Sequence, residues 1–205
     1  MRGGSEKGNE WYLAGKKSTK RNSWKDFNAS AQWLINNKYT SPEKLAVWGT
    51  SAGGMLIGRA ITERPDLYKV AVPNVGALNM LRLEFSPYGP ANIPEFGTVT
   101  KKDEFQALFE MDAFHHIKNN EKYPAQLIKT GFNDPRVASY FPGKFAARMQ
   151  AENRSKNPVF LYVNFGAGHG QGNTLDDALM DKVDELSFIL WQTGQPDFQP
   201  KNDNQ

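Results

Sequence analysis

Residues 44–65 read KLAVWGTSAGGMLIGRAITERP, and their pattern is the clearest indication of the fold. Its apolar start predicts a short strand over residues 44–48, which Gly49 ends. The apolar spacing of residues 55–63 predicts a helix, which the following proline ends because it cannot continue one. The Gly-x-Ser-x-Gly turn between them, residues 49–53, is the pattern that places a nucleophilic serine between a strand and a helix.

The turn has a geometric requirement that favours glycine. We expect a side chain at Gly49 or Gly53 to clash with the neighbouring backbone. The Ser51 hydroxyl would then stand clear of the sheet, and the amide of Ala52 would point at a developing oxyanion. No Gly-Lys-Ser/Thr follows, so the turn is not a phosphate-binding loop. A structural glycine turn is the alternative, and the strand–turn–helix context favours the nucleophile.

Strand and helix patterns alternate along the rest of the chain. The expected strands cover residues 44–48, 70–72, 125–130 and 159–163. The expected helices are one after residue 22, capped by Asn22 or Ser23, and those at residues 55–63, 104–109, 139–151 and 176–191. Residues 1–21 are expected to be loop, and residues 194–205 a disordered tail. The alternation predicts an α/β protein of three layers, αβα, with a mostly parallel sheet.

Two further residues follow strands in the order that a catalytic triad requires. Asp134 comes after the third expected strand, and His169 lies between glycines after the fourth. An aspartate in a turn is commonly a turn-former. The α/β-hydrolase fold, however, places its triad in the order Ser, Asp or Glu, His, with each residue at the carboxyl end of a strand. We therefore expect His169 to accept the Ser51 proton and Asp134 to orient the imidazole.

Composition narrows the class of protein. The length of 205 residues suits one domain, and a net charge of +3 is too small to indicate nucleic-acid binding. The most basic run, residues 16–21, is expected to be a solvated loop. The absence of cysteine excludes disulfides and thiol catalysis. No apolar run reaches membrane-spanning length and no signal peptide is apparent, so a soluble protein of cytoplasm or periplasm is expected.

The remaining polar clusters give weaker signals. His115 and His116 are adjacent, so their side chains diverge and cannot easily share a metal ion. Four acidic residues are expected on the solvated face of the last helix: Asp176, Asp177, Asp181 and Glu185. We expect neither a metal nor another cofactor.

The chain resembles the catalytic domain of the prolyl oligopeptidase family of serine peptidases over most of residues 2–192. The matching segments are residues 2–4 with Gly8 and Trp11, 39–42, 49–54, 64–67, 133–134 with 136–137, and 166–170. The resemblance implies a domain over residues 1–193 that cleaves short peptides through an acyl-enzyme. It also implies that Arg136 anchors a substrate carbonyl and that Val137 and Val75 line the pocket before the scissile bond. Without the resemblance, Arg136 would read as a surface ion-pair partner.

The chain departs from the family pattern at two places. Asn92 stands where proline-specific members place a tryptophan that stacks on the substrate proline, which argues against strict proline specificity. The family also has earlier strands, a tyrosine that completes the oxyanion hole, and a β-propeller, and residues 1–21 supply none of these. Only the C-terminal half of the sheet is therefore evident. A carboxylesterase and a catalytically silent fragment remain alternatives to a peptidase.

The missing strands have a consequence for association. The strand at residues 44–48 would lie at an unpaired sheet edge, and such edges pair readily with other chains. We therefore expect a homo-oligomer or aggregation through this edge, besides a peptide substrate as partner.

Overall fold

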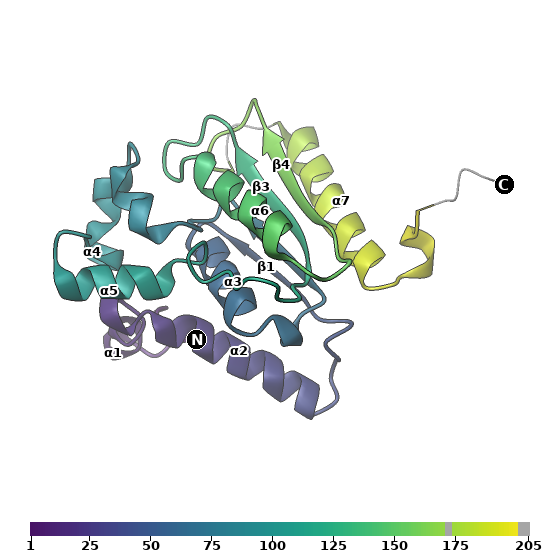
Figure 1. Ribbon diagram of the computed structural model, residues 1–205, viewed down its shortest axis with the longest axis horizontal. Coiled ribbons are helices and arrows are strands. Elements are labelled where there is room, and N and C mark those ends of the chain that lie inside the picture. The colour runs from purple at the N-terminus through teal and green to yellow at the C-terminus, as the bar shows by residue number, and fades with distance from the viewer. Residues whose placement is uncertain (171–173, 201–205) are drawn as a thin grey trace.

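The computed structural model describes residues 1–170 and 174–200, and its centre is a parallel sheet of four strands (Figure 1). The strands lie in the order β1 (Ala46–Thr50), β2 (Val70–Asn74), β3 (Ala125–Gly131) and β4 (Val159–Asn164). All three neighbouring pairs are parallel, so the carboxyl ends of the strands meet at one edge of the sheet. That edge is where ligand and catalytic sites of α/β sheets form.

Helices cover both faces of this sheet, which confirms the three-layer arrangement. On one face, α3 (Ala52–Glu63) and α6 (Tyr140–Glu152) pack with the strands through the largest apolar cluster, which includes Ile57, Ile128 and Phe145. On the other face, α7 (Leu175–Gln192) packs through Phe188 against Val70 and Leu127. Burying apolar side chains on both faces is what a parallel sheet requires.

The first strand is shifted from its expected position. β1 runs from Ala46 to Thr50 rather than over residues 44–48. The glycine that was expected to end it stays in register with β2, because Gly49 pairs with Pro73 and Thr50 with Asn74. In the described part of the chain, β1 pairs with β2 alone, so its other edge carries no strand.

The N-terminal segment is more ordered than a loop. It contains α1 (Asn9–Leu13), the 3₁₀ turn η1 (Lys17–Thr19) and α2 (Arg21–Asn36). The expected caps were wrong, because α2 begins before Asn22 and both polar side chains bind the N-terminal segment instead. Asn22 Nδ2 donates to the Ala14 carbonyl, and Ser23 Oγ donates to the Arg2 carbonyl.

The basic run is not a solvated loop. Lys17 Nζ lies 2.9 Å from Glu104 Oε1 in α5 (Lys102–Met111), and Lys20 Nζ lies 2.8 Å from Glu95 Oε1 in α4 (Ile93–Phe96). These ion pairs join the N-terminal segment to the helices beside it in Figure 1. Residues between β2 and α5 are otherwise irregular, as expected, with 3₁₀ turns at Met80–Phe85 and Gly89–Asn92.

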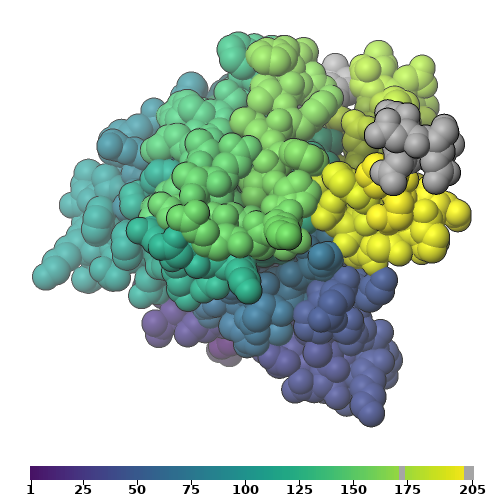
Figure 2. Space-filling model, turned by 45° about the vertical axis from the view of Figure 1, so that its right-hand side comes forward, coloured from purple at the N-terminus to yellow at the C-terminus, as the bar shows by residue number. Residues whose placement is uncertain are grey.

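The C-terminal residues are folded further than expected. The turn η5 (Pro196–Phe198) follows α7, and Gln199 Nε2 donates to the Trp191 carbonyl at 3.1 Å. In Figure 2 these yellow residues lie beside the green segment of α6 and β4. Phe160 of β4 stacks on Trp191 of α7. Residues 201–205 of the expected disordered tail lie outside the described residues. None of the described helices combines the length and apolar character needed to cross a bilayer.

Candidate active site

Ser51 occupies a strained turn between β1 and α3. Its φ of 57° and ψ of −117° are rare for a residue with a side chain, and such strain is concentrated at functional sites. Two backbone hydrogen bonds hold the turn. The Ser51 amide donates to the Asn74 carbonyl at 2.9 Å, and the Met55 amide donates to the Ser51 carbonyl at 3.1 Å. The serine is therefore fixed to β2 on one side and to α3 on the other.

Two glycines permit this turn, but only one of them was expected. A Cβ at Gly49 would lie 2.5 Å from the Gly53 carbonyl oxygen, so a side chain there is excluded. Gly53 has nothing within 4 Å of an added Cβ, so the expected clash at this position was wrong. The crowded position is Gly54, whose Cβ would come within 2.6 Å of the Gly76 Cα. Gly54 is buried, and Gly53 is partly exposed.

Ser51, His169 and Asp134 form one chain of hydrogen bonds. His169 Nε2 lies 2.8 Å from Ser51 Oγ, and His169 Nδ1 lies 2.6 Å from Asp134 Oδ2. The Asp134 side chain is fully buried, and Oδ1 accepts from the amides of Arg136 at 2.8 Å and Val137 at 2.9 Å. An ionised carboxylate can only accept, so His169 Nδ1 donates and Nε2 is left to accept the serine proton. The arrangement can transfer a proton from the hydroxyl to the imidazole.

The loops that carry Asp134 and His169 pack directly on each other. A Cβ at Gly131 would collide with the Gly168 carbonyl oxygen, so a glycine is needed where β3 ends. The Phe132 amide donates to the Asn164 carbonyl at 2.9 Å, and the Asn133 amide donates to the Ala167 carbonyl at 3.1 Å. Backbone contacts between adjacent parallel strands thus continue into the loops and bring the two side chains together. From the sequence, Gly131 was expected only to end a strand, although a glycine at such a position can also indicate a close approach of two backbones.

A cavity of ≈ 500 Å³ opens beside the hydroxyl of Ser51. Val75 and Arg136 line it, whereas Val137 and Asn92 do not. Val137 is buried in the apolar cluster that contains Phe141 and Met55, and Asn92 Nδ2 donates to the carbonyl of Tyr88, which precedes the 3₁₀ turn Gly89–Asn92. Ala52 adjoins a second, smaller cavity on the side of the N-terminal segment.

Val75 is a wall residue with an unexpected backbone. Its φ of 41° is unfavourable for a β-branched residue, and its amide donates to the Lys129 carbonyl at 2.8 Å. Its side chain is almost fully buried. This conformation cannot be predicted from the sequence around Val75, because it depends on the packing of β2 and β3.

The wall of the cavity formed by α7 contains charged side chains that were expected to be exposed to solvent. Glu185 is 3% exposed rather than solvated, and it pairs with the buried Lys129 of β3. Asp181 pairs with the same lysine. Among residues 1–170 and 174–200, no group of three or more His, Cys, Asp or Glu side chains is arranged to hold a metal ion.

Known proteins match this chain over nearly its whole length. A model of the prolyl oligopeptidase family matches residues 1–196. The prolyl endopeptidase of Elizabethkingia miricola is 39% identical over 195 residues, which make up 95% of this chain and 28% of that protein. A solved prolyl endopeptidase structure has a TM-score of 0.91 and 36% identity, over 97% of this chain and 29% of that one. Oligopeptidase B from Leishmania major has a TM-score of 0.90 and 29% identity, over 94% and 27% of the two chains. The chain spans less than a third of each.

Proposed function

Because this chain belongs to the prolyl oligopeptidase family, we propose that residues 1–193 are the catalytic domain of a serine peptidase that hydrolyses short peptides through an acyl-enzyme. The observation that carries the proposal is the hydrogen-bond chain from Ser51 Oγ through His169 to Asp134. A serine is nucleophilic at neutral pH only when a base removes its proton, and His169 is placed to do so.

In the proposed mechanism, Ser51 Oγ attacks the substrate carbonyl carbon while His169 Nε2 takes the hydroxyl proton. The buried Asp134 carboxylate stabilises the imidazolium that forms. His169 then protonates the leaving amine, and the carbon–nitrogen bond breaks to leave the acyl group on Ser51. A water molecule, deprotonated by His169, releases the acid and regenerates the serine.

The Ala52 amide is the proposed oxyanion donor. As the first residue of α3, Ala52 has an amide without an acceptor inside the helix, at the positive end of the helix dipole. One such donor contributes about 100- to 1000-fold to the rate. The resemblance implies a second donor, a tyrosine, from strands that do not occur in residues 1–21.

Arg136 and Val75 are the proposed substrate contacts on the cavity wall. In the described part of the chain, no acidic side chain forms an ion pair with Arg136, so its guanidinium can bind a substrate carbonyl instead. We propose a peptidase without strict proline specificity, because the sequence has Asn92, not a tryptophan, where proline-specific members place their stacking ring. Asn92 itself does not line the cavity. Val137 would act indirectly, because its amide holds Asp134.

Ester hydrolysis is the second candidate, because the same arrangement of serine, histidine and aspartate cleaves esters. An ester has a better leaving group than an amide, so its hydrolysis needs less stabilisation of the oxyanion. The ratio of ester to peptide turnover by the purified chain separates the two. A silent fragment would turn over neither substrate.

We also propose that a second copy of the chain pairs along β1. The support is that β1 has β2 as its one strand partner in the described residues. The exposed side chain of Trp48 lies on this strand.

A fluorophosphonate probe tests the nucleophile without assuming a substrate. We expect a single covalent adduct, which mass spectrometry should map to Ser51, and Ser51→Ala should abolish it. Ser139→Ala is the matched control, because Ser139 flanks α6 and its side chain makes no cap hydrogen bond. An adduct that survives Ser51→Ala would refute the assignment.

A further inference from the structure

The first half of α7 has little apolar contact with the sheet. In residues 174–184 no side chain is buried, and the buried residues of the helix are Glu185 and Phe188. Apolar packing on Val70, Val72 and Leu127 is confined to the second half of the helix. Another interaction must therefore hold the beginning of α7 against the strands.

Lys129 provides that interaction. Its side chain is 4% exposed, and Nζ lies 3.0 Å from Glu185 Oε1 and 3.2 Å from Asp181 Oδ1. Nζ also donates to the Asp181 carbonyl at 3.2 Å and lies over the Tyr162 ring of β4, 5.3 Å from its centre. One ammonium group thus contacts two successive turns of α7 and the neighbouring strand.

Lys182 extends this cluster to the first strand. Lys182 Nζ lies 2.6 Å from Glu185 Oε2 and 4.2 Å from the centre of the Trp48 ring. The carboxylate of Glu185 is therefore shared between two lysines. We call Lys129, Asp181, Lys182 and Glu185 the α7 anchor.

The α7 anchor faces the same cavity as Ser51 and His169. His169 precedes Leu175, the first residue of α7, by six positions, and it follows Asn164, the last residue of β4, by five. Only a few residues of chain therefore separate His169 from β4 on one side and from the anchored helix on the other. This short covalent connection limits how far His169 can lie from α7.

We propose that Lys129 is a positioning residue for His169, acting through Asp181 and Glu185 to fix the middle of α7 on the sheet and so to restrain the exposed turns before it. The proposal rests on the proposed function for its catalytic consequence. Ion pairs from one lysine to two turns restrict the position of the helix along its axis more than apolar packing does, because apolar surfaces can slide past each other. The buried charges lose hydration, which opposes part of this stabilisation. A misplacement of about 1 Å can reduce turnover about 100-fold.

Lys129→Met tests this role, because it keeps the length and apolar stem of the side chain and removes the ammonium. Lys129→Arg should restore function in part. Lys144→Met is the matched control, since Lys144 also makes one side-chain hydrogen bond, to Asn79 Oδ1, and one cation–π contact, to Phe114, but lies outside the cavity. If Lys129→Met does not fold, Glu185→Gln removes one ion pair and keeps a side chain that can accept a hydrogen bond.

Three measurements on the full chain decide the proposal. We expect Lys129→Met to slow fluorophosphonate labelling of Ser51 at least about tenfold and to lower kcat for a p-nitrophenyl ester with little change in KM. Hydrogen exchange should quicken over residues 175–184 and not over residues 186–192. The low-field proton resonance of the short His169–Asp134 hydrogen bond should broaden or shift. Lys144→Met should change none of these.

Wild-type labelling by a folded Lys129→Met variant, or unchanged exchange over residues 175–184, would overturn the proposal. If the wild-type chain is not labelled at Ser51, the proposed function fails. The exchange and proton-resonance measurements still test the anchor in that case, because neither needs turnover.

Discussion

Gly54 and Gly76 lie back to back, so that a Cβ on Gly54 would come within 2.6 Å of the Gly76 Cα. This contact sets the start of α3 directly on the backbone that follows β2. The position of the Ser51 turn depends on it, because Ser51 is bonded to both elements.

Gly54→Ala should therefore destabilise the protein by about 1–3 kcal/mol, the usual cost of overpacking. Gly53→Ala is the control, because nothing lies within 4 Å of its added Cβ and alanine has the higher helix propensity. Urea titration of both variants checks the difference, and fluorophosphonate labelling reports whether the turn survives. Equal stability of the two variants would contradict the packing argument.

Asp134→Asn should preserve the fold and reduce labelling of Ser51 by up to about 10⁴-fold. Asparagine keeps an oxygen for the amides of Arg136 and Val137, but its other group is a donor and cannot accept from His169 Nδ1. The imidazole would then favour the wrong tautomer. Labelling kinetics measure the loss, with Asp66→Asn at an exposed carboxylate as the control. A loss smaller than tenfold would exclude Asp134 from the proposed mechanism.

Arg136→Ala should reduce peptide turnover about 10- to 100-fold more than turnover of a small ester. A hydrogen bond to a charged group contributes about 1.5–3 kcal/mol, and only the longer substrate reaches it. Steady-state kinetics on one peptide and one p-nitrophenyl ester give the ratio. Arg154→Ala, which removes an exposed arginine bonded to Asn120, should leave the ratio unchanged. Equal losses on both substrates would make Arg136 structural.

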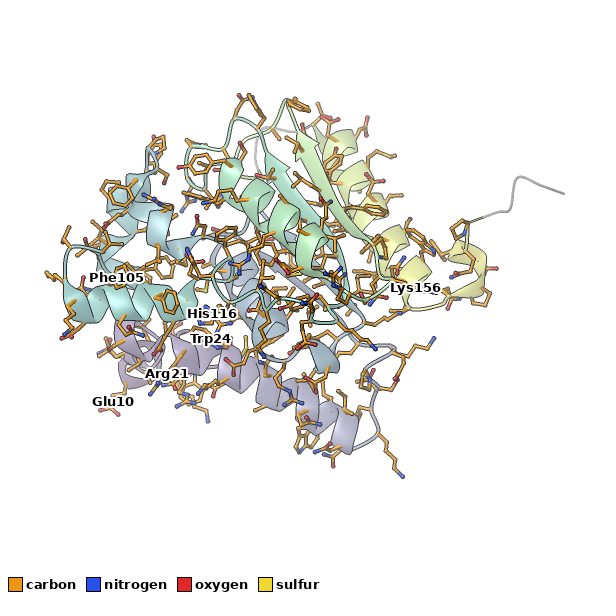
Figure 3. The ribbon with its side chains drawn as sticks, viewed as in Figure 1. Glu10, Arg21, Trp24, Phe105, His116 and Lys156 are labelled. Carbon is orange, nitrogen blue, oxygen red and sulfur yellow. The ribbon has the colours of Figure 1, made fainter. Side chains whose placement is uncertain are left out.

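The free energy of unfolding should decrease below about pH 6.5, and part of this decrease should come from His116. The pKa of His116 lies below its ordinary value, chiefly because the side chain is buried and next because of the Arg59 guanidinium. Asp112 raises the pKa, but by less, and His115 lowers it slightly. Trp24 and His116, both labelled in Figure 3, are neighbours of this arginine.

The sign follows from proton binding. Between the ordinary histidine pKa of about 6.5 and the lower folded-state pKa, the unfolded chain binds a proton that the folded chain does not. The free energy of unfolding therefore decreases as the pH falls through this window. Urea titrations at about pH 5 and pH 8 should show a smaller difference for His116→Gln than for the wild type. The same difference in both proteins would assign the effect to another group.

Association through β1 should depend on protein concentration. We expect light scattering to show a mass that rises with concentration, and Trp48→Glu to reduce it, because a charge on an edge strand opposes pairing. Trp33→Glu is the control, since Trp33 is similarly exposed on α2, away from the sheet. A monomer at all concentrations would refute the proposed pairing.

The sequence predicted the elements well where a single stretch determines them. The strand–turn–helix around Ser51, and the glycines around His169, are local patterns, and each remaining strand contains a short apolar stretch. The predictions were wrong where contacts between residues far apart in the sequence determine the structure. Asn22 and Ser23 bind the N-terminal segment rather than cap α2, and Glu185 of α7 is buried beside Lys129, which lies far away in the sequence on β3. Neither partner can be read from spacing along the chain.

The strands follow one another in the sheet in the same order as in the sequence, and this order determines when the site can form. Ser51 and His169 are 118 positions apart, and contacts of that range are made late because loop closure must precede them. During synthesis the serine emerges first and has no base until the fourth strand and its loop have been added. Under the proposed mechanism, the Ser51 hydroxyl of the nascent chain therefore stays without its base until β4 and the His169 loop have been added.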